Sequence, residues 1–540
     1  MGCGIAAARG TEGWARRVRR WVSSLDAQGW VARVAAWVVV LAGLLAYASV
    51  FRQTYIDDAF ITFQYARNLA EHLSWGFFPD RPSNTATSPL NVVLLAAFDR
   101  ALPGSTVDAA AWLNAATWGL TLAALLRISR RLLGGPHFAL LAFVGLVTNP
   151  LLISGIGLEG YLYALLMVAA AALFLERRWW WLGLALGLLT LTRPDGLLLC
   201  GLLLLVLPGG LAARGKVALA FGLAVAPWFL YSWVALGSIV PDTLVIKLEQ
   251  TAWGPTTFLD GFSLYRQRFP LPTAASLWPA ALAPFAVVPL WRAGREARSA
   301  FAALVAYAAI HYAVYGALAV PPYHWYYTHQ VVPLVLVGAL GAAYLLQGMA
   351  RSADRVDRWA AVATTALPAA AMVYLGYGLG WPPRQAPIHS NWAAPGEYRS
   401  VGLWLHDNIE PGAILELRGE IGTLAYYSGR YLIDEFTDRN RANATIAELE
   451  AGQPRPMSLL LRANGAWRDD EPPFPPPTYL LDVVSGEALN APSGPDVVAA
   501  WDVSSRWLGR SRIVLRSTAF LSIAVEPDGA GGAPTPRAPP

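Results

Sequence analysis

Long apolar segments, separated by short polar or basic loops, fill most of the first 380 residues. About eleven of these segments are suited to cross the ~30 Å hydrocarbon core of a bilayer as helices. The predicted spans are 34–51, 108–126, 137–154, 160–175, 179–192, 196–212, 217–235, 275–291, 300–319, 330–347 and 359–379. The pattern therefore predicts an α-helical polytopic membrane protein.

The composition supports this class and excludes others. The 540 residues are 55% hydrophobic and 14% charged, whereas soluble domains carry roughly 25% charged residues. The formal net charge of +5 is interpreted by location, because Arg and Lys in loops set membrane orientation and do not indicate nucleic acid binding. The sequence contains no G-x-x-x-x-G-K-[ST] phosphate loop, so no nucleotide is expected.

The segment 88–102 is apolar but short, contains Asp99 and Arg100, and ends before Pro103. If it lies on the membrane surface, every basic cluster falls on one side of the membrane, which the positive-inside rule identifies as cytoplasmic. These clusters are 9–33, 127–131, 177–178, 214–216, 292–298 and 351–358. We therefore expect a surface helix at 88–102 and a cytoplasmic N-terminus.

This topology divides the chain into four regions. They are a basic cytoplasmic N-terminus (1–33), a transmembrane domain (34–379) with the catalytic outer loop 52–107, an extracytoplasmic domain (380–525) and a tail (526–540). The odd number of spans places 380–525 outside, and its segment "AILELRGEIGTLAYYSGRYLIDEF" is typical of short strands and turns in a small α/β domain. The Pro- and Gly-rich tail is expected to be disordered.

Two adjacent acids, Asp57 and Asp58, follow the first predicted span by a few residues. One interpretation is a pair of helix-capping or loop carboxylates that are simply solvated. The other starts from their mutual repulsion, which favours a proton or a cation near the pair. Such a pair can act as a general base and a metal ligand at the membrane face.

Charged residues also interrupt two turns on the predicted outer side. Glu159 lies in "GIGLEGYLYALL", and Arg193 and Asp195 lie in "LTLTRPDGLLLC". Glu159 could be an ordinary interfacial acid, and Arg193 with Asp195 could only close a tight proline turn. Because outer loops are depleted in Arg, the alternative is an anion clamp that binds a phosphate.

Lysine is rare in this chain, and the outer Lys247 is one of only two. It is either an interfacial side chain that reaches toward water or a phosphate contact. The segment "VPPYHWYYTHQVVP" holds Tyr323, His324, Trp325 and His329 at the outer membrane level. An aromatic belt explains the aromatic residues. Stacking on a sugar ring, with a histidine contacting phosphate or metal, is the functional alternative.

Five segments, in this order, carry a resemblance to a known family. They are "YIDDAFITFQYARNLAEH" with "TSPL", "GLEGYLYALL", "LTRPDGLLL", "GSIVPDTLVIK" and "GEIGTLAYYSGRYLIDEFTD". Together, from Tyr55 to about Asp438, they resemble the GT-C-type integral-membrane glycosyltransferases, and in particular the bacterial arabinofuranosyltransferase AftB-like group. Gln64 stands where this group has Arg, and "GLEG" replaces G-L-E-T.

The resemblance implies a GT-C fold and an inverting transfer of a sugar from a polyprenyl-phosphate donor. The acceptor would be a hydroxyl of a cell-envelope glycan, lipid or protein on the outer face of a bacterial plasma membrane, and arabinofuranose is one candidate sugar. By resemblance Asp57 is the general base, Asp58 supports it or binds a metal, and Glu159 is the second outer-loop acid of the catalytic set. A divalent metal (Mg²⁺, Mn²⁺ or Ca²⁺) would be held by Asp58 and Glu159. The implied donor-phosphate contacts are Arg193, Lys247, His324 and His329, and the implied substrate contacts are Tyr55, Arg67, Asp195, Tyr323, Trp325 and Glu420.

The competing hypothesis is a membrane transporter or flippase for a lipid-linked or anionic substrate. Charges inside polytopic proteins often mark such a pathway. Here the charges gather at one membrane face and no inverted repeat is apparent in the sequence, which favours the enzyme.

Overall fold

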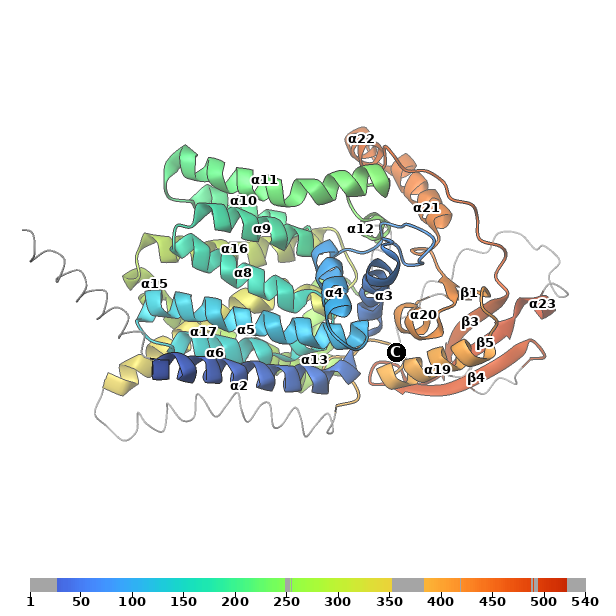
Figure 1. Ribbon diagram of the computed structural model, residues 1–540, viewed down its shortest axis with the longest axis horizontal. Helices are drawn as coiled ribbons and strands as arrows, with labels where there is room; N and C mark the ends of the chain where they lie inside the picture. Colours follow the sequence, from blue (N-terminus) through green and yellow to red (C-terminus); the bar gives the residue numbers. More distant parts are fainter. Residues whose placement is uncertain are drawn as a thin grey trace, which may run out of the picture.

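The computed structural model describes residues 27–247, 253, 255–351, 383–417, 419–486, 489 and 494–521. The predicted span 359–379, the tail 526–540 and most of the basic N-terminus lie outside the described residues. Figure 1 shows a bundle of roughly parallel helices with a mixed α/β domain at one end. The bundle corresponds to the predicted transmembrane domain, and the α/β domain to the predicted extracytoplasmic one.

The long helices of the bundle form where the apolar segments were predicted. They are α2 (Ala27–Phe51), α5 (Thr106–Leu133), α6 (His137–Val147), α8 (Gly160–Leu175), α9 (Trp179–Thr192), α10 (Gly196–Val206), α11 (Gly210–Ala235), α16 (Arg295–Ala317) and α17 (Thr328–Arg351). Local signals set their ends. The N-terminus of α5 is a capping box of Ser105 and Asp108, and its C-terminus is Gly134 with a left-handed φ of 71°.

Six segments of the described residues are long and apolar enough to cross a membrane. Four more apolar helices, α6, α8, α9 and α10, have only 11 to 16 residues. The protein is thus a multi-pass membrane protein, but the eleven predicted spans are confirmed only in part.

Two predicted spans are broken helices. The apolar stretch 137–154 is divided into α6 and α7 (Pro150–Ser154), because Asn149 caps a new helix that begins at Pro150. The stretch 275–291 is divided among α14 (Pro270–Leu277), the 3₁₀ turns η3 (Trp278–Ala281) and η4 (Ala283–Ala286), and α15 (Val287–Arg292). Prolines recur through it, and each removes a backbone donor that a continuous helix would use.

Two helices run across the end of the bundle, between the spans and the α/β domain (Figure 1). They are α3 (Asp57–His72) and α4 (Pro89–Ala101). The α4 helix packs on α3 and α5 and does not span, which agrees with the prediction for 88–102. The short elements at this end are η1 (Arg52–Thr54), α12 (Asp242–Ile246), η2 (Phe258–Asp260), α13 (Gly261–Arg268) and η5 (His324–Tyr327).

The C-terminal domain is built on a five-stranded mixed sheet in the order β2-β1-β3-β5-β4. Strands β1 (Ile414–Leu417), β2 (Tyr431–Ile433) and β3 (Tyr479–Ser485) are parallel, while β4 (Val497–Ser505) and β5 (Gly509–Ser517) are antiparallel. The helices are α19 (Pro395–Asn408), α20 (Gly422–Ser428), α21 (Arg439–Gly452), α22 (Arg455–Asn464) and α23 (Thr518–Leu521). This is the small α/β architecture that the sequence predicts.

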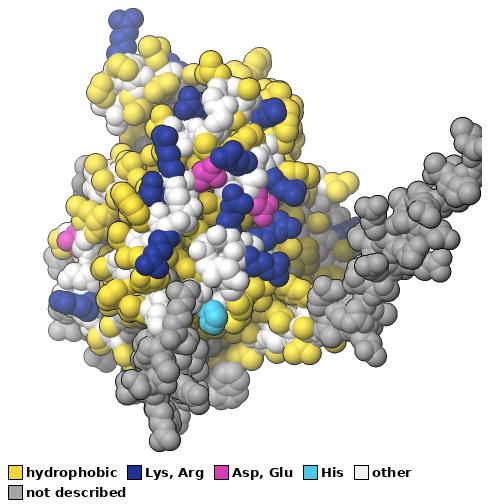
Figure 2. Space-filling model, turned by 90° about the vertical axis from the view of Figure 1, so that its left-hand side faces the viewer, with side chains coloured by type: hydrophobic (Ala, Val, Ile, Leu, Met, Phe, Trp, Pro, Cys, Tyr) yellow, Lys and Arg dark blue, Asp and Glu magenta, His cyan; other side chains and the backbone are white. Residues whose placement is uncertain are grey.

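The opposite end of the bundle is basic. Figure 2 faces this end and shows many Lys and Arg side chains with few acids. Arg131, in the last turn of α5, and Arg177, after α8, both pair with Glu296 at the start of α16. Three predicted cytoplasmic loops therefore do lie together, at the end away from the α/β domain. This arrangement agrees with the prediction that the basic loops share one side of the membrane; the orientation itself stays a prediction.

Candidate active site

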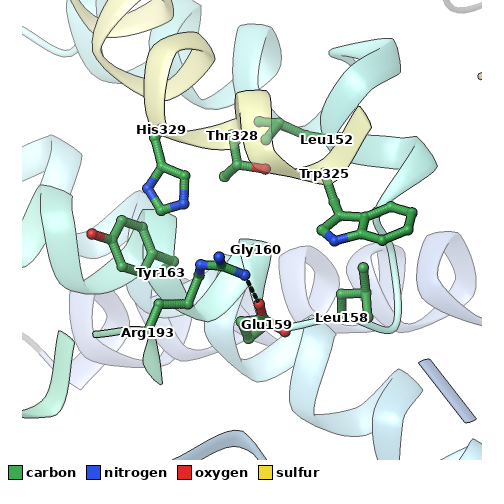
Figure 3. A pocket seen from close by; sticks show the side chains of 10 residues that line it. Leu152, Leu158, Glu159, Gly160, Tyr163, Arg193, Trp325, Thr328 and His329 are labelled. Carbon is green, nitrogen blue, oxygen red and sulfur yellow. Dashed lines mark hydrogen bonds and ion pairs between the residues drawn. The ribbon is translucent and has the colours of Figure 1, made fainter. Parts of the chain in front are cut away.

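A pocket lies at the end of the bundle that contacts the C-terminal region, and Figure 3 shows the side chains that line it. Its walls come from the turn between α7 and α8, from the turn after α9 and from the beginning of α17. The lining residues are Leu152, Gly155, Leu158, Glu159, Gly160, Tyr163, Arg193, Trp325, Thr328 and His329. Four residues that the sequence singles out, Glu159, Arg193, Trp325 and His329, are therefore brought to one cavity.

Arg193 is the central cation of this pocket. Its Nη1 donates to Glu159 Oε1 at 2.7 Å and its Nε to Asp195 Oδ2 at 3.0 Å. The Nη2 atom faces the Tyr315 hydroxyl at 3.4 Å, and the guanidinium lies over the Tyr326 ring at 5.2 Å. Only 8% of the Arg193 side chain and 7% of the Glu159 side chain are exposed. The local Arg193–Asp195 pair of the simpler hypothesis exists, and Glu159 makes it a three-charge cluster.

Asp195 connects this cluster to two histidines. The Tyr315 hydroxyl donates to both Asp195 oxygens, at 3.0 and 3.1 Å. His329 Nε2 lies 3.3 Å and His311 Nε2 3.6 Å from Asp195 Oδ2. The two imidazole rings stack at 4.0 Å. Asp195 is thus surrounded by donors and is not placed as a free substrate ligand.

Asp58 differs from its neighbour Asp57 in its contacts with the described residues. It lies in the first turn of α3 and is half-buried. No hydrogen bond or ion pair joins its carboxylate to another of the described residues. Burial raises the pKa of Asp58, the Lys247 charge lowers it and the Glu159 charge raises it, so that the pKa ends above its ordinary value. This carboxylate can accept a proton from an incoming group.

Lys247 ends α12 close to Asp58 and is half-buried. Its Nζ lies 4.6 Å from the centre of the Tyr323 ring, and Tyr323 stacks on Trp325 at 4.6 Å. The aromatic segment predicted from the sequence thus holds a cation beside the pocket. An ammonium here is placed to meet a negatively charged ligand.

Asp57 instead joins the bundle to the C-terminal domain. Its two carboxylate oxygens accept the backbone N–H groups of Gly422 at 2.8 Å and Thr423 at 2.7 Å, at the beginning of α20. A Cβ on Gly422 would lie 2.2 Å from the Asp57 carbonyl oxygen, so the contact requires glycine. Burial raises the pKa of Asp57 to about 6, although these donors lower it. The geometry supports an anchoring role more directly than the base predicted from the sequence.

Glu420 belongs to the same interface. Asn391 Nδ2 donates to its Oε1 at 2.7 Å, the Trp392 N–H donates to its Oε2 at 2.9 Å, and Tyr398 donates a short hydrogen bond. Burial and the Asp57 charge raise the pKa of Glu420 to about 8. The structure therefore places Glu420 next to Asp57. Glu420 does not line the pocket, where its predicted substrate role would place it.

The raised pKa of Glu420 leads to a prediction about stability. Between about pH 4.5 and 8 the folded protein keeps a proton that the unfolded chain has lost. Stability should therefore fall as the pH rises through this window. Glu420→Gln stays neutral, so its melting temperature relative to wild type should increase with pH. Thermal unfolding in detergent measures this difference; the exposed Glu71→Gln is the control, and a pH-independent difference for Glu420→Gln would refute the assignment.

Three other predicted residues lie outside the pocket. His324 is buried, with Nε2 at 3.1 Å from the Ser154 carbonyl and Nδ1 near Ser390, and it does not line the pocket. Arg67 donates to the Tyr426 carbonyl at 3.0 Å and secures α20. Tyr55 is buried against Gly157, whose added Cβ would lie 2.9 Å from the ring. All three have structural contacts, and the donor-phosphate contact predicted for His324 and the substrate contacts predicted for Arg67 and Tyr55 stay predictions.

The sequence analysis missed His311 and Tyr315. Both lie on α16, four residues apart and so on one helix face. A histidine inside an apolar span is an uncommon and costly choice, and this signal could have identified His311. Nothing local indicates that its partner is Asp195.

The predicted metal ligands do not form the best cation site. Glu159 is occupied by Arg193, which leaves Asp58 without a second free carboxylate from the predicted pair. Among the described residues, Asp195, His311 and His329 do place three ligand atoms within 4.8 Å of one another. These residues could hold a metal ion.

Comparisons with known proteins identify the fold. No protein-family model and no curated protein sequence matches the chain. ArnT from Cupriavidus metallidurans, in a structure bound to undecaprenyl phosphate, aligns with a TM-score of 0.54 and 15% identity over 91% of this chain and 98% of that chain. AglB, an oligosaccharyltransferase of Archaeoglobus fulgidus in complex with an inhibitory peptide and a dolichol-phosphate, aligns with 0.51 and 11% over 83% and 69%.

A third structure is that of an arabinofuranosyltransferase. The arabinofuranosyltransferase AftD from Mycobacteria aligns with a TM-score of 0.45 and 14% identity, over 89% of this chain and 40% of that chain. A similarity this loose carries no argument about specificity. The chain thus has the fold of GT-C membrane glycosyltransferases, as predicted, and the finer AftB-like assignment is not confirmed.

Proposed function

We propose that this GT-C-like membrane protein transfers a sugar from a polyprenyl-phosphate donor to an acceptor hydroxyl, with inversion at the anomeric carbon. One observation carries the proposal: Asp58, a half-buried carboxylate without a hydrogen bond or ion pair to another described residue, is electrostatically coupled to Lys247 and lies at the pocketed end of the bundle. The undecaprenyl phosphate in the ArnT structure and the dolichol-phosphate in the AglB structure support this donor class.

The donor phosphate needs cations. When the anomeric bond breaks, its electron pair goes to the phosphate oxygen, and the leaving polyprenyl phosphate gains negative charge. Lys247 and Arg193 supply positive charge on this side of the pocket. Charges fixed in a poorly solvated site stabilise developing charge without having to reorganise.

The acceptor needs a base. Its hydroxyl oxygen forms the new bond to the anomeric carbon, and its proton passes to a carboxylate as the attack proceeds. We assign this role to Asp58, because both Asp57 oxygens already accept hydrogen bonds from α20. The raised pKa of Asp58 makes it a stronger base than an ordinary carboxylate while it remains ionised.

The aromatic side chains beside Lys247 indicate a sugar as the transferred group. The stacked pair Tyr323 and Trp325 offers flat apolar faces beside Lys247, suited to one face of a sugar ring. Arabinofuranose remains a candidate on the sequence resemblance. We further propose that the pocket and residues 380–525 face the outside of a bacterial plasma membrane, with a cell-envelope glycan, lipid or protein as acceptor.

The direct test is turnover by the purified protein in detergent. Undecaprenyl-phosphate sugars of different kinds, arabinofuranose among them, are supplied with a hydroxyl acceptor, and release of undecaprenyl phosphate is followed. We expect release that depends on the acceptor. A protein that binds the donor and moves it across vesicles without any release would be a flippase instead.

Lys247 provides a sharper prediction. Lys247→Gln keeps a polar side chain but removes one charge-assisted contact to the donor phosphate, worth about 1.5–3 kcal/mol. The donor KM should therefore rise by about 10- to 100-fold, with the fold intact. The matched control is Lys216→Gln, the other lysine of the chain, on α11 near its beginning at the basic end of the bundle. Equal donor KM values for both variants would remove Lys247 from the site.

A further inference from the structure

We propose that Asp195, His311 and His329 form a binding site for a divalent transition metal, with Zn²⁺ as the best-fitting ion. The site is distinct from the acid pair Asp57–Asp58. It lies next to Arg193, where helices α16 and α17 meet the turn between α9 and α10. Its ligands come from three separate elements, so a bound ion would connect them.

The first argument is the state of the histidine nitrogens. His311 and His329 are 2% and 1% exposed, and the Nε2 atom of each is buried without a hydrogen-bond partner in the described structure. Both atoms nevertheless approach Asp195 Oδ2, at 3.6 and 3.3 Å. Buried polar atoms without partners are uncommon, and two that converge on one carboxylate oxygen leave room for a shared cation.

The second argument is the charge of the surroundings. The cluster holds two carboxylates, Glu159 and Asp195, but only one guanidinium, Arg193. An uncompensated buried charge is costly. A divalent ion converts the net charge to positive, which also suits an adjacent anionic ligand.

The third argument is the hydrogen bonding of the second ring nitrogen, Nδ1, of each histidine. Metal-bound histidines usually donate their second ring N–H to a neighbouring acceptor. His329 Nδ1 lies 2.5 Å from the Tyr307 hydroxyl, which can accept this hydrogen. His311 Nδ1 lies 3.0 Å from the Gln330 amide nitrogen, while Gln330 Oε1 is buried and unpartnered. Gln330 Nε2 also donates to the Ala308 carbonyl at 3.2 Å. Turning this amide by half a rotation gives up that hydrogen bond and presents Oε1 to His311 Nδ1–H.

The ligand set selects the class of metal. Two imidazoles and one carboxylate suit Zn²⁺ and similar ions better than Mg²⁺ or Ca²⁺, which prefer oxygen ligands. Three protein ligands leave a fourth position of a tetrahedral ion open. Asp195 Oδ2 also accepts from Arg193 Nε at 3.0 Å. A metal on this oxygen competes with Arg193 for it, and the ion therefore acts as a positioning element for the guanidinium.

The test measures metal and needs neither donor nor acceptor. The purified wild-type protein is stripped with a chelator, reloaded with Zn²⁺, desalted and analysed for metal content and melting temperature. We expect a single tightly bound Zn²⁺ per chain and a higher melting temperature. His311→Gln with His329→Gln should abolish both effects, whereas the buried control His389→Gln should keep them.

A milder variant covers the case in which the double variant does not fold. Gln330→Ala leaves all three ligands in place, and it should weaken Zn²⁺ binding by about 10- to 100-fold. Wild-type protein that retains no Zn²⁺, or a folded double variant that binds it as tightly as wild type, overturns the proposal. Neither result would by itself overturn the proposed sugar transfer, which is judged by acceptor-dependent release of undecaprenyl phosphate and by the Asp58 and Lys247 variants.

Discussion

Replacing Asp58 by asparagine should lower kcat by about 10²- to 10⁴-fold, the usual loss when a general base is removed. The amide keeps the shape of the carboxylate but cannot take the acceptor proton. Because no described residue other than its own backbone depends on this side chain for a hydrogen bond or an ion pair, the melting temperature should change little. Steady-state transfer rates and thermal unfolding of the same preparation measure both quantities.

Asp57→Asn is the matched control, since it makes the same chemical change one residue earlier. Asp57 accepts two backbone hydrogen bonds from α20, and asparagine can replace only one of these acceptors. We expect reduced stability of about 1.5–3 kcal/mol, with transfer retained by the folded fraction. The reverse pattern, an inactive but stable Asp57→Asn beside an active Asp58→Asn, would return the base to Asp57.

This pair shows where sequence reasoning reached its limit. Adjacent residues on a helix project about 100° apart, so Asp57 and Asp58 face different surroundings. Asp57 meets Gly422, which is 365 positions away in the chain. No local pattern contains that contact. The sequence could identify an important acid pair, but only the docked C-terminal domain separates the anchoring acid from the available one.

The sequence predicted more of the fold than of the candidate site. Apolar periodicity located the helices of the bundle, of which six segments among the described residues are long and apolar enough to cross a membrane. The placement of basic loops identified 88–102 as a surface segment, which became α4. The errors arose where local backbone chemistry interrupts an apolar run. Asn149 with Pro150 and the prolines of 270–289 end helices that hydropathy alone continues. The histidine partners of Asp195 were missed because they depend on packing between separate helices.

Arg193→Met should cost about 3–5 kcal/mol of folding free energy, because it removes one partner of a buried ion cluster. Methionine fills a comparable volume but leaves Glu159 and Asp195 as buried carboxylates whose shared cation is gone. We expect a large fall in melting temperature or failure to accumulate in the membrane. Protease resistance and thermal unfolding in detergent measure this loss.

A double variant separates electrostatics from packing. Adding Glu159→Gln to Arg193→Met removes one of the two carboxylate charges that have lost their cation, so part of the lost stability should return. If Arg193 acted only through its aliphatic contacts, the second substitution would restore no stability.

Arg193→Lys provides the functional comparison. It keeps the charge but not the fork that reaches Glu159 and Asp195 together, so we expect a folded enzyme with a raised donor KM. Wild-type donor KM in Arg193→Lys would limit Arg193 to holding the turn between α9 and α10 and would leave Lys247 as the phosphate-binding cation.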